Sequence, residues 1–250
     1  MYTRIKTDNE IAAMRESGKM LATVLDVLKK RAVTGMSTKD LADIAKQELR
    51  SLGGQPTFLG YQGFPDVLCV SINNEVVHGI PKSDVVIGSG DIVSMDFGVT
   101  YKGMITDSAI SVLVGEGSDQ DRHLLETTYQ SMNAGIDAVR GGVRVGTIGH
   151  AVEAVLNAAK YGIVRDLVGH GVGHELHEDP NIPNYGKDNS GPALEAGMTI
   201  AIEPMATLGT DNVFIADDEW TILTRDGSRA AHFEHTILIT EAGSEILTTL

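Results

Sequence analysis

Carboxylates occur within segments that otherwise have the composition of buried β-strands, at Asp96, Asp107, Glu203 and Glu234. β-Strands disfavour Asp, and a carboxylate among apolar residues needs a partner. In the stretch 93–97, VSMDF, alternation places the apolar residues on one face of the strand and Asp96 on the other. We therefore expect these acidic side chains to face a polar partner rather than the hydrophobic core.

A tight hairpin is predicted to bring Asp96 and Asp107 together. The residues Tyr101-Lys102-Gly103 have the composition of a turn, and Met104 begins the returning strand. With a two-residue loop, both aspartates fall on one face as direct or diagonal neighbours. Two carboxylates at that separation repel each other strongly unless a proton or a cation lies between them.

The second half of the chain repeats the acidic pattern. GDIVSMD aligns with GMTIAIE, which places Asp96 over Glu203, and Glu234 lies in a later β-rich run, HFEHTILIT. A single acid of this kind is commonly solvated or paired with Lys, but acids at equivalent positions predict two facing acidic hairpins with converging carboxylates. Together with a histidine they would bind one or two divalent cations such as Mn, Fe(II), Co or Zn. Bridging carboxylates would hold two cations about 3.5–4 Å apart around a shared water.

The stretch LVGHGVGHELHEDP concentrates three histidines, His170, His174 and His177. His170 and His174 have a spacing that could chelate zinc on a helix, but the glycines between them disfavour a helix there. We predict a strand or loop, in which alternation would put His170 and His174 on one face and His177 on the other. His78 lies between an apolar pair and a turn, and an isolated histidine in such a position is most often a structural residue.

The elements that must position these residues follow an α+β order. Capping signals predict helices that begin after Thr7 and Ser37, a long helix over 119–139, and a fourth helix capped by Thr147. Short β-rich runs between glycine and proline turns follow each helix pair. The order predicts one catalytic domain over 1–250, with pseudo-symmetric halves of about 1–115 and 116–250.

Composition excludes several classes of protein. The net charge of −14 argues against a nucleic-acid or anionic-membrane partner, because both require clustered Lys and Arg. The single cysteine, Cys69, excludes an internal disulfide framework. The N-terminus lacks the apolar core of a signal peptide, and no apolar run is long enough to span a bilayer. We expect a cytoplasmic protein.

The chain resembles the type I methionine aminopeptidases over nearly its full length. The resemblance is carried, in family order and spacing, by SINNEVVHGIP, GDIVSMDFGVTYKGMITDSA, VGHGVGHELHEDPNIPNY, GMTIAIEPM and FEHTI. It implies the pita-bread fold, a pseudo-twofold-symmetric antiparallel sheet backed by two helix pairs. It also implies a monomer that removes the N-terminal Met of nascent polypeptides and short peptides, when the second residue is small, with transient proximity to the ribosome.

The resemblance also implies a role for each site residue. Two divalent cations (Co, Mn, Fe(II), Zn or Ni) would be bound by Asp96, Asp107, His170, Glu203 and Glu234, with Asp96 and Glu234 bridging them. Glu203 would also move the proton of the attacking water, His177 would stabilise the oxyanion, and His78 would contact the scissile amide. The methionine pocket would comprise Tyr61, Phe64, Cys69 and Trp220, bordered by Leu176. His174 receives no role.

The chain departs from the family pattern at Leu167, Leu176 and His232, where the family commonly has an aromatic residue or Met, an aromatic residue and Gln. The departure at His232 bears on metal preference or adds a hydrogen-bond donor. Two alternatives stand beside the methionine aminopeptidase interpretation. One is an Xaa-Pro aminopeptidase or prolidase-like hydrolase, which usually carries a large additional N-terminal domain. The other is a non-enzymatic peptide-binding protein on the same scaffold.

Overall fold

The computed structural model describes residues 2–250. The helices are α1 (Asp8–Arg31), α2 (Thr38–Leu52), η1 (Tyr61–Gly63, a short 3-10 helix), α3 (Asp119–Asp137) and α4 (Val145–Ala158). The strands of the first half are β1 (Gln55–Pro56), β2 (Cys69–Ile72), β3 (Glu75–Val77), β4 (Ile92–Tyr101) and β5 (Met104–Leu113). The second half contributes β6 (Gly162–Ile163), β7 (Gly169–Gly171), β8 (Glu178–Ile182), β9 (Thr199–Ile202), β10 (Met205–Thr207), β11 (Val213–Ile215), β12 (Ile222–Thr224), β13 (Ala230–His232), β14 (His235–Ile239) and β15 (Ser244–Ile246). This order confirms the predicted α+β class.

The first three α-helices begin at capping boxes. In α1 the Thr7 hydroxyl accepts from the backbone N–H of Glu10, whose carboxylate accepts from the backbone N–H of Thr7. Ser37 and Ser118 cap α2 and α3 in the same way. The helices therefore begin where local chemistry satisfies their free N–H groups.

The predicted cap of the fourth helix, Thr147, is wrong. The N-cap of α4 is Arg144, three residues earlier, and its side chain makes no capping hydrogen bond. The backbone N–H groups of Val145 and Gly146 donate to the carbonyls of Pro192 and Ser190 instead. Because a neighbouring loop supplies these acceptors, the helix needs no capping side chain at its N-terminus.

The β4–β5 hairpin has the predicted two-residue loop. Lys102 and Gly103 both have positive φ, 50° and 77°, as a tight turn between twisted strands requires. The register pairs Gly98 with Asp107 and Asp96 with Ala109. Asp96 and Asp107 are therefore diagonal neighbours on one face, as predicted.

The second acidic pair does not lie in a hairpin, which corrects the prediction. Strand β9 pairs antiparallel with β14, and the strands β10 to β13 intervene along the chain. Glu203 follows β9 directly, and Glu234 precedes β14, in the register that pairs Ile202 with His235. The strand ends at Ile202, two residues before Pro204, which has no backbone N–H to continue the ladder.

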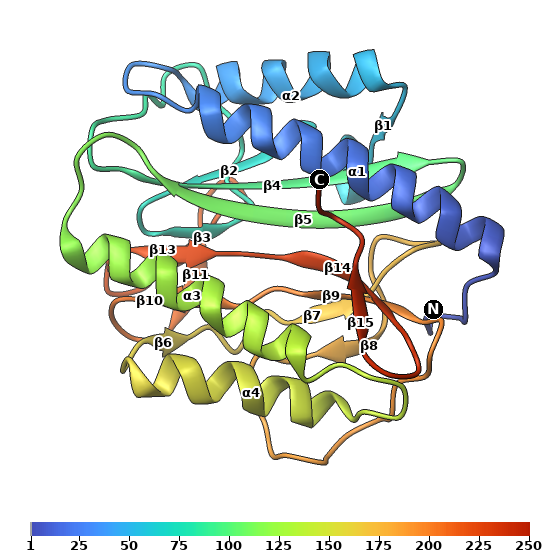
Figure 1. The fold of residues 1–250 in the computed structure, drawn as a ribbon. Coiled ribbons are helices and arrows are strands. Elements are labelled where there is room, and N and C mark those ends of the chain that lie inside the picture. The colour runs from blue at the N-terminus through green and yellow to red at the C-terminus, as the bar shows by residue number, and fades with distance from the viewer. Residues whose placement is uncertain (1) are drawn as a thin grey trace.

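The two halves meet where β5 lies beside β14 (Figure 1). Ala109 and Glu234 form an antiparallel backbone bridge, and the Ser108 hydroxyl donates to the carbonyl oxygen of Glu234 at 2.5 Å. The backbone N–H of Asp107 donates to the hydroxyl of Thr236 at 2.9 Å. These bonds place the acids of β5 next to those that flank β14.

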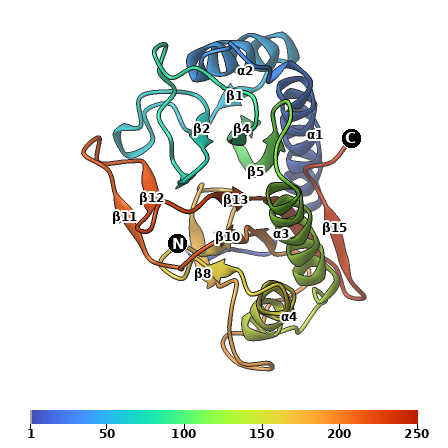
Figure 2. The same ribbon diagram turned by 90° about the vertical axis from the view of Figure 1, so that its left-hand side faces the viewer.

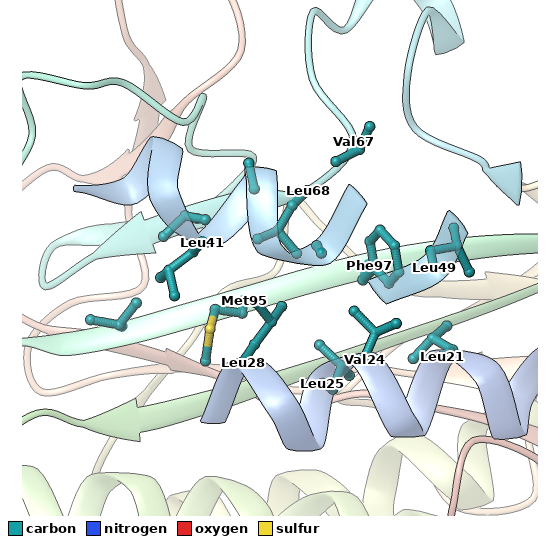
Figure 3. Close-up of a cluster of buried hydrophobic side chains, with 14 of the residues drawn as sticks. Leu21, Val24, Leu25, Leu28, Leu41, Leu49, Val67, Leu68, Met95 and Phe97 are labelled. Carbon is teal, nitrogen blue, oxygen red and sulfur yellow. The ribbon is translucent and has the colours of Figure 1, made fainter. Parts of the chain in front are cut away.

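Each helix pair covers the apolar face of its own strands. Helices α1 and α2 pack on the side of β4 that carries Met95 and Phe97 (Figure 3). Helices α3 and α4 pack in the same way on β9 and β14, through residues such as Ile148, Ile200 and Ile237. In Figure 2, α1, α3 and α4 lie along one side of the strands, and the β11–β12 hairpin extends from the other. The strand faces that bear the acids are thus turned away from the helices.

No helix within residues 2–250 combines the length and the apolar composition that a membrane crossing requires.

Candidate active site

One cavity of about 150 Å³ is lined by every residue that is predicted to take part in catalysis or substrate binding. Its lining includes the five nominated metal ligands, Asp96, Asp107, His170, Glu203 and Glu234. It also includes the two nominated histidines and the nominated pocket residues, His78, His177, Tyr61, Phe64, Cys69 and Trp220. Residues from both halves of the chain therefore share one cavity.

The carboxylates are buried together and lack partners. Asp107 and Glu234 are 4% and 2% exposed, and one oxygen each of Asp96, Asp107 and Glu234 has no hydrogen-bond partner in the part of the chain that the structure describes. Burial and the neighbouring carboxylate of Glu203 raise the pKa of Asp107 to about 7. Burial likewise raises the pKa of Glu203 to about 8. Unpaired buried oxygens of this kind fit a bound cation.

His170 meets the requirements of a nitrogen ligand. Its Nδ1 donates to the carbonyl oxygen of Gly171 at 2.9 Å, which leaves Nε2 free, 3.4 Å from a carboxylate oxygen of Glu203. Burial, with the nearby His177, lowers the pKa of His170 to about 3, so the ring is neutral. A neutral imidazole whose second nitrogen donates to a carbonyl is the usual form of a metal-binding histidine.

The predicted grouping of His170 with His174 is wrong. Strand β7 ends at Gly171, so strand alternation does not extend to His174. The rings of His170 and His177 lie 4.4 Å apart at their centroids instead. The loop after Gly171 reverses the faces that a continuous strand would have given these histidines.

His174 belongs to a second, partly buried cluster on the other side of the same loop. Its Nε2 donates to the carboxylate of Glu10 at 2.7 Å, and its backbone N–H donates to Glu178 at 2.7 Å. Glu178 also pairs with Lys6, Nζ to Oε2 at 3.2 Å, and both side chains are fully buried. His174 thus connects the start of α1 to the turn that carries His177, a structural role that the sequence did not indicate.

The ligand atoms form two groups that share one residue. Asp107, His170 and Glu234 offer ligand atoms within 4.8 Å of one another, and so do Glu203, His232 and Glu234. Glu234 belongs to both groups, in line with its predicted bridging role. Asp96 belongs to neither, so this grouping gives its predicted bridging role no support.

The two histidines outside the ligand set border the same cavity. Nδ1 of His177 lies 2.8 Å from the hydroxyl of Tyr61, within hydrogen-bond distance. Burial lowers the pKa of His177 and brings the pKa of His78 to about 4, so both rings are neutral. His78 has a φ of 60°, a conformation that non-glycine residues rarely adopt and that is concentrated at functional sites.

The other end of the cavity is apolar. Phe64 lies between Trp220 and Phe58, with ring centroids 5.1 Å and 6.5 Å away, and Leu176 closes the pocket. Burial raises the pKa of the Cys69 thiol, which keeps it neutral. An apolar pocket with a neutral thiol is suited to an unbranched hydrophobic or thioether side chain.

Sequence reasoning missed two lining residues, Phe58 and Gln62. Gly98, on the acidic face of β4, is the sequence feature that could have indicated an aromatic side chain packed against this strand. A Cβ at Gly98 would come within 2.7 Å of the Phe58 ring, so only glycine leaves room for the aromatic side chain there. Gln62 lies in η1 with a φ of 48°, and nothing in its local sequence indicated that it borders the site.

The chain is similar to known metallopeptidases in both sequence and fold. The model of metallopeptidase family M24 matches residues 12–241. Methionine aminopeptidase 1 of Bacillus subtilis is 46% identical over 97% of this chain and 98% of its own length. The crystal structure of methionine aminopeptidase from Thermotoga maritima gives a TM-score of 0.98 at 44% identity, covering 99% of this chain and 100% of that chain.

A more distant structure shows the fold alone. Prolidase from Pyrococcus furiosus gives a TM-score of 0.80 at 22% identity and covers 98% of this chain but 65% of that chain. The pita-bread fold that the resemblance implied is confirmed by these structural matches.

Proposed function

Because the chain belongs to metallopeptidase family M24, we propose that it removes the N-terminal methionine from peptides and nascent proteins whose second residue is small. The observation that carries this proposal is the cavity itself. Buried carboxylates with unpaired oxygens line one part of it, and an apolar pocket with a neutral thiol lines another. A methionine side chain fits the apolar part, and its scissile bond then lies beside the carboxylates.

The residues present fit divalent cations. Carboxylate oxygens and a neutral imidazole form the donor set, which suits Co, Mn, Fe(II), Zn or Ni. When bound, such cations lower the pKa of water and polarise a carbonyl oxygen. Two cations are proposed, because the ligand atoms form two groups that share Glu234.

Glu203 is the proton carrier. Its carboxylate lies between the imidazoles of His170 and His232, at 3.4 Å and 3.5 Å, and points into the cavity. It accepts the proton of the attacking water and delivers it to the leaving amine. Burial raises the pKa of this carboxylate, which makes it a stronger proton acceptor than an exposed glutamate.

The two neutral histidines act on the peptide bond. Nδ1 of His177 pairs with Tyr61, which leaves Nε2 to donate to the oxygen of the tetrahedral intermediate. His78, which lies beside Trp220, hydrogen-bonds the scissile amide. Residues from both halves are needed for these contacts, which supports a single catalytic domain over 1–250.

The proposal extends to the setting of the reaction. A net charge of −14 argues against tight binding to nucleic acid or anionic membranes. We place the enzyme in the cytoplasm as a monomer, where nascent chains near the ribosome present their N-terminal methionine.

A pair of peptides tests the activity and separates it from the Xaa-Pro alternative. We expect release of methionine from Met-Ala-Ser, and no measurable release of the first residue from an Arg-Pro-Ser peptide. The Glu203→Gln variant serves as the inactive control, and Glu195→Gln, an exposed acid, serves as the matched active control. Cleavage of the proline peptide alone would favour the alternative, and cleavage of neither would favour a binding protein.

A further inference from the structure

His232 is an imidazole at the metal centre that the proposed mechanism leaves without a function. It ends strand β13, and its side chain is 2% exposed. One hydroxyl, that of Ser111, holds the backbone of His232 on both sides of its Cα. It accepts from the His232 N–H at 2.9 Å and donates to the His232 carbonyl oxygen at 2.8 Å. The backbone position of His232 is therefore set by the β5–β13 contact.

The ring points at the carboxylates. Nε2 lies 3.5 Å from an oxygen of Glu203, and one ring nitrogen lies within 4.8 Å of ligand atoms of both Glu203 and Glu234. Neither ring nitrogen has a hydrogen-bond partner within residues 2–250. A fully buried imidazole with two free nitrogens is costly unless something binds it.

The arrangement around Glu203 is two-sided. His170 approaches one carboxylate oxygen and His232 approaches the other, at nearly equal distances of 3.4 Å and 3.5 Å. The two ligand groups accordingly contain one imidazole each, His170 in one and His232 in the other. The commonly found glutamine at this position would offer an amide in place of the second imidazole.

We propose that His232 is a second nitrogen ligand of the metal centre, binding through its ring to a cation that Glu203 and Glu234 also hold. This inference rests on the proposed metal-dependent function and adds a ligand to it. Imidazole favours Zn, Co and Ni, whereas Mn prefers oxygen ligands. His232 therefore shifts the metal preference of this chain toward the nitrogen-preferring ions.

The two imidazoles should differ in strength as ligands. His170 donates its Nδ1 proton to a carbonyl, whereas His232 has no such acceptor in the described chain. Partners of this kind are worth about 10–100-fold in metal affinity. We therefore expect the cation at Glu203, His232 and Glu234 to bind about 10–100-fold more weakly than the cation at His170.

The test counts metal-bound histidines directly. The full chain is labelled with ¹⁵N-histidine and titrated with Zn(II) to two equivalents while the ring-nitrogen resonances are recorded. In the wild-type protein we expect two histidines to shift to zinc-bound positions, one at the first equivalent and one at the second. The matched variants are His232→Gln, which should show one bound histidine, and His150→Gln, an exposed histidine, which should show two.

A calorimetric titration adds a second readout. His232→Gln should weaken the second equivalent of Co(II) by about 10-fold or more and the second equivalent of Mn(II) by less. One bound histidine in the wild-type protein at two equivalents overturns the role of His232, whatever the variant does. No bound histidine at all overturns the metal centre and the proposed function with it.

Discussion

Two clusters of buried acids lie on either side of the loop that carries the histidines, and they differ in how their charge is compensated. Glu178 accepts from the backbone N–H groups of His174 and Glu175 and from the ammonium group of Lys6. Burial alone would raise the pKa of Glu178, but hydrogen bonds from Thr3 and the loop backbone, with the charge of Lys6, lower it. In the candidate metal centre, burial raises the pKa of every carboxylate, and repulsion from neighbouring carboxylates raises it further at Asp96, Asp107 and Glu234.

The difference separates a structural cluster from a functional one. Around Glu178 the chain supplies its own cation and its own donors, so the buried charge is compensated within the fold. Around Asp96, Asp107 and Glu234 the described residues supply no such partner to several buried oxygens. The energetic cost of holding these acids together without a cation is recovered only when one binds, which is how a site gains affinity for a metal.

The largest expected effect distinguishes the two clusters by activity. Glu203→Gln should lower kcat for Met-Ala-Ser by about 10²- to 10⁴-fold, because an amide cannot accept a proton. Glu178→Gln should change kcat far less, because Glu178 holds the loop and does not face the cavity. Methionine release by each variant, with divalent cation at saturation, is the measurement. Equal losses in the two variants would remove the distinction.

The next effect distinguishes them by stability. Lys6→Met leaves the buried carboxylate of Glu178 without its cation and should lower the free energy of unfolding by about 3–5 kcal/mol. Lys30→Met, which breaks an exposed pair with Asp26, should lower it by about 0–1 kcal/mol. Urea denaturation of both variants measures the difference. A loss below 1 kcal/mol in Lys6→Met would show that the backbone donors alone stabilise Glu178.

The two clusters should respond to pH in opposite directions. Asp107 and Glu203 have folded-state pKa values of about 7 and 8, above those of an unfolded chain. Their contribution is complete below about pH 4 and is lost as the pH rises through about 7–8. Glu178, with a lowered pKa, contributes above its ordinary pKa and loses that contribution as the pH falls through its folded-state value.

Melting temperatures of the metal-free protein between about pH 5 and 8.5 test this dependence. The melting temperature should fall as the pH rises from about 5 to about 8 and level off above that, and a saturating divalent cation should abolish most of the decline. Asp107→Asn, which removes one of the repelling charges, should also flatten it. A decline unaffected by both changes would assign the pH dependence to other groups.

The smallest effect concerns the histidine that the loop presents to the cavity. Tyr61→Phe removes the hydroxyl that lies 2.8 Å from His177 Nδ1. One hydrogen bond of this kind is worth about 0.5–1.5 kcal/mol, so kcat should fall by about 2- to 10-fold. KM should change little, because the aromatic ring remains. A loss as large as that of His177→Ala would mean that Tyr61 itself takes part in proton transfer.

Local patterns predicted part of the site. Asp96 and Asp107 were placed correctly because strand alternation and a two-residue turn depend only on neighbouring residues. The pairing of Glu203 with Glu234 depends on strands separated along the chain, and the prediction of a second hairpin failed there. His170 and His177 were assigned to opposite faces because nothing in the glycine-rich stretch marks where β7 ends.

Family resemblance alone predicts the residues of the apolar pocket. Alternation cannot show that Tyr61, Phe64 and Trp220 share one pocket, because they lie on separate loops that only the folded chain brings together. His174 illustrates the limit most clearly. Its partner Glu10 lies in the first turn of α1, far away in sequence, so no local signal could assign it a structural role.

Metal dependence of methionine release tests the central claim most directly. Protein stripped with EDTA is assayed on Met-Ala-Ser under anaerobic conditions, and then again after addition of Co(II), Mn(II), Fe(II), Zn(II) or Ni(II). We predict no release of methionine from the stripped protein and restored release with at least one of these cations. Undiminished release in the presence of EDTA would contradict the assignment of Asp96, Asp107, His170, Glu203 and Glu234 to a catalytic metal centre.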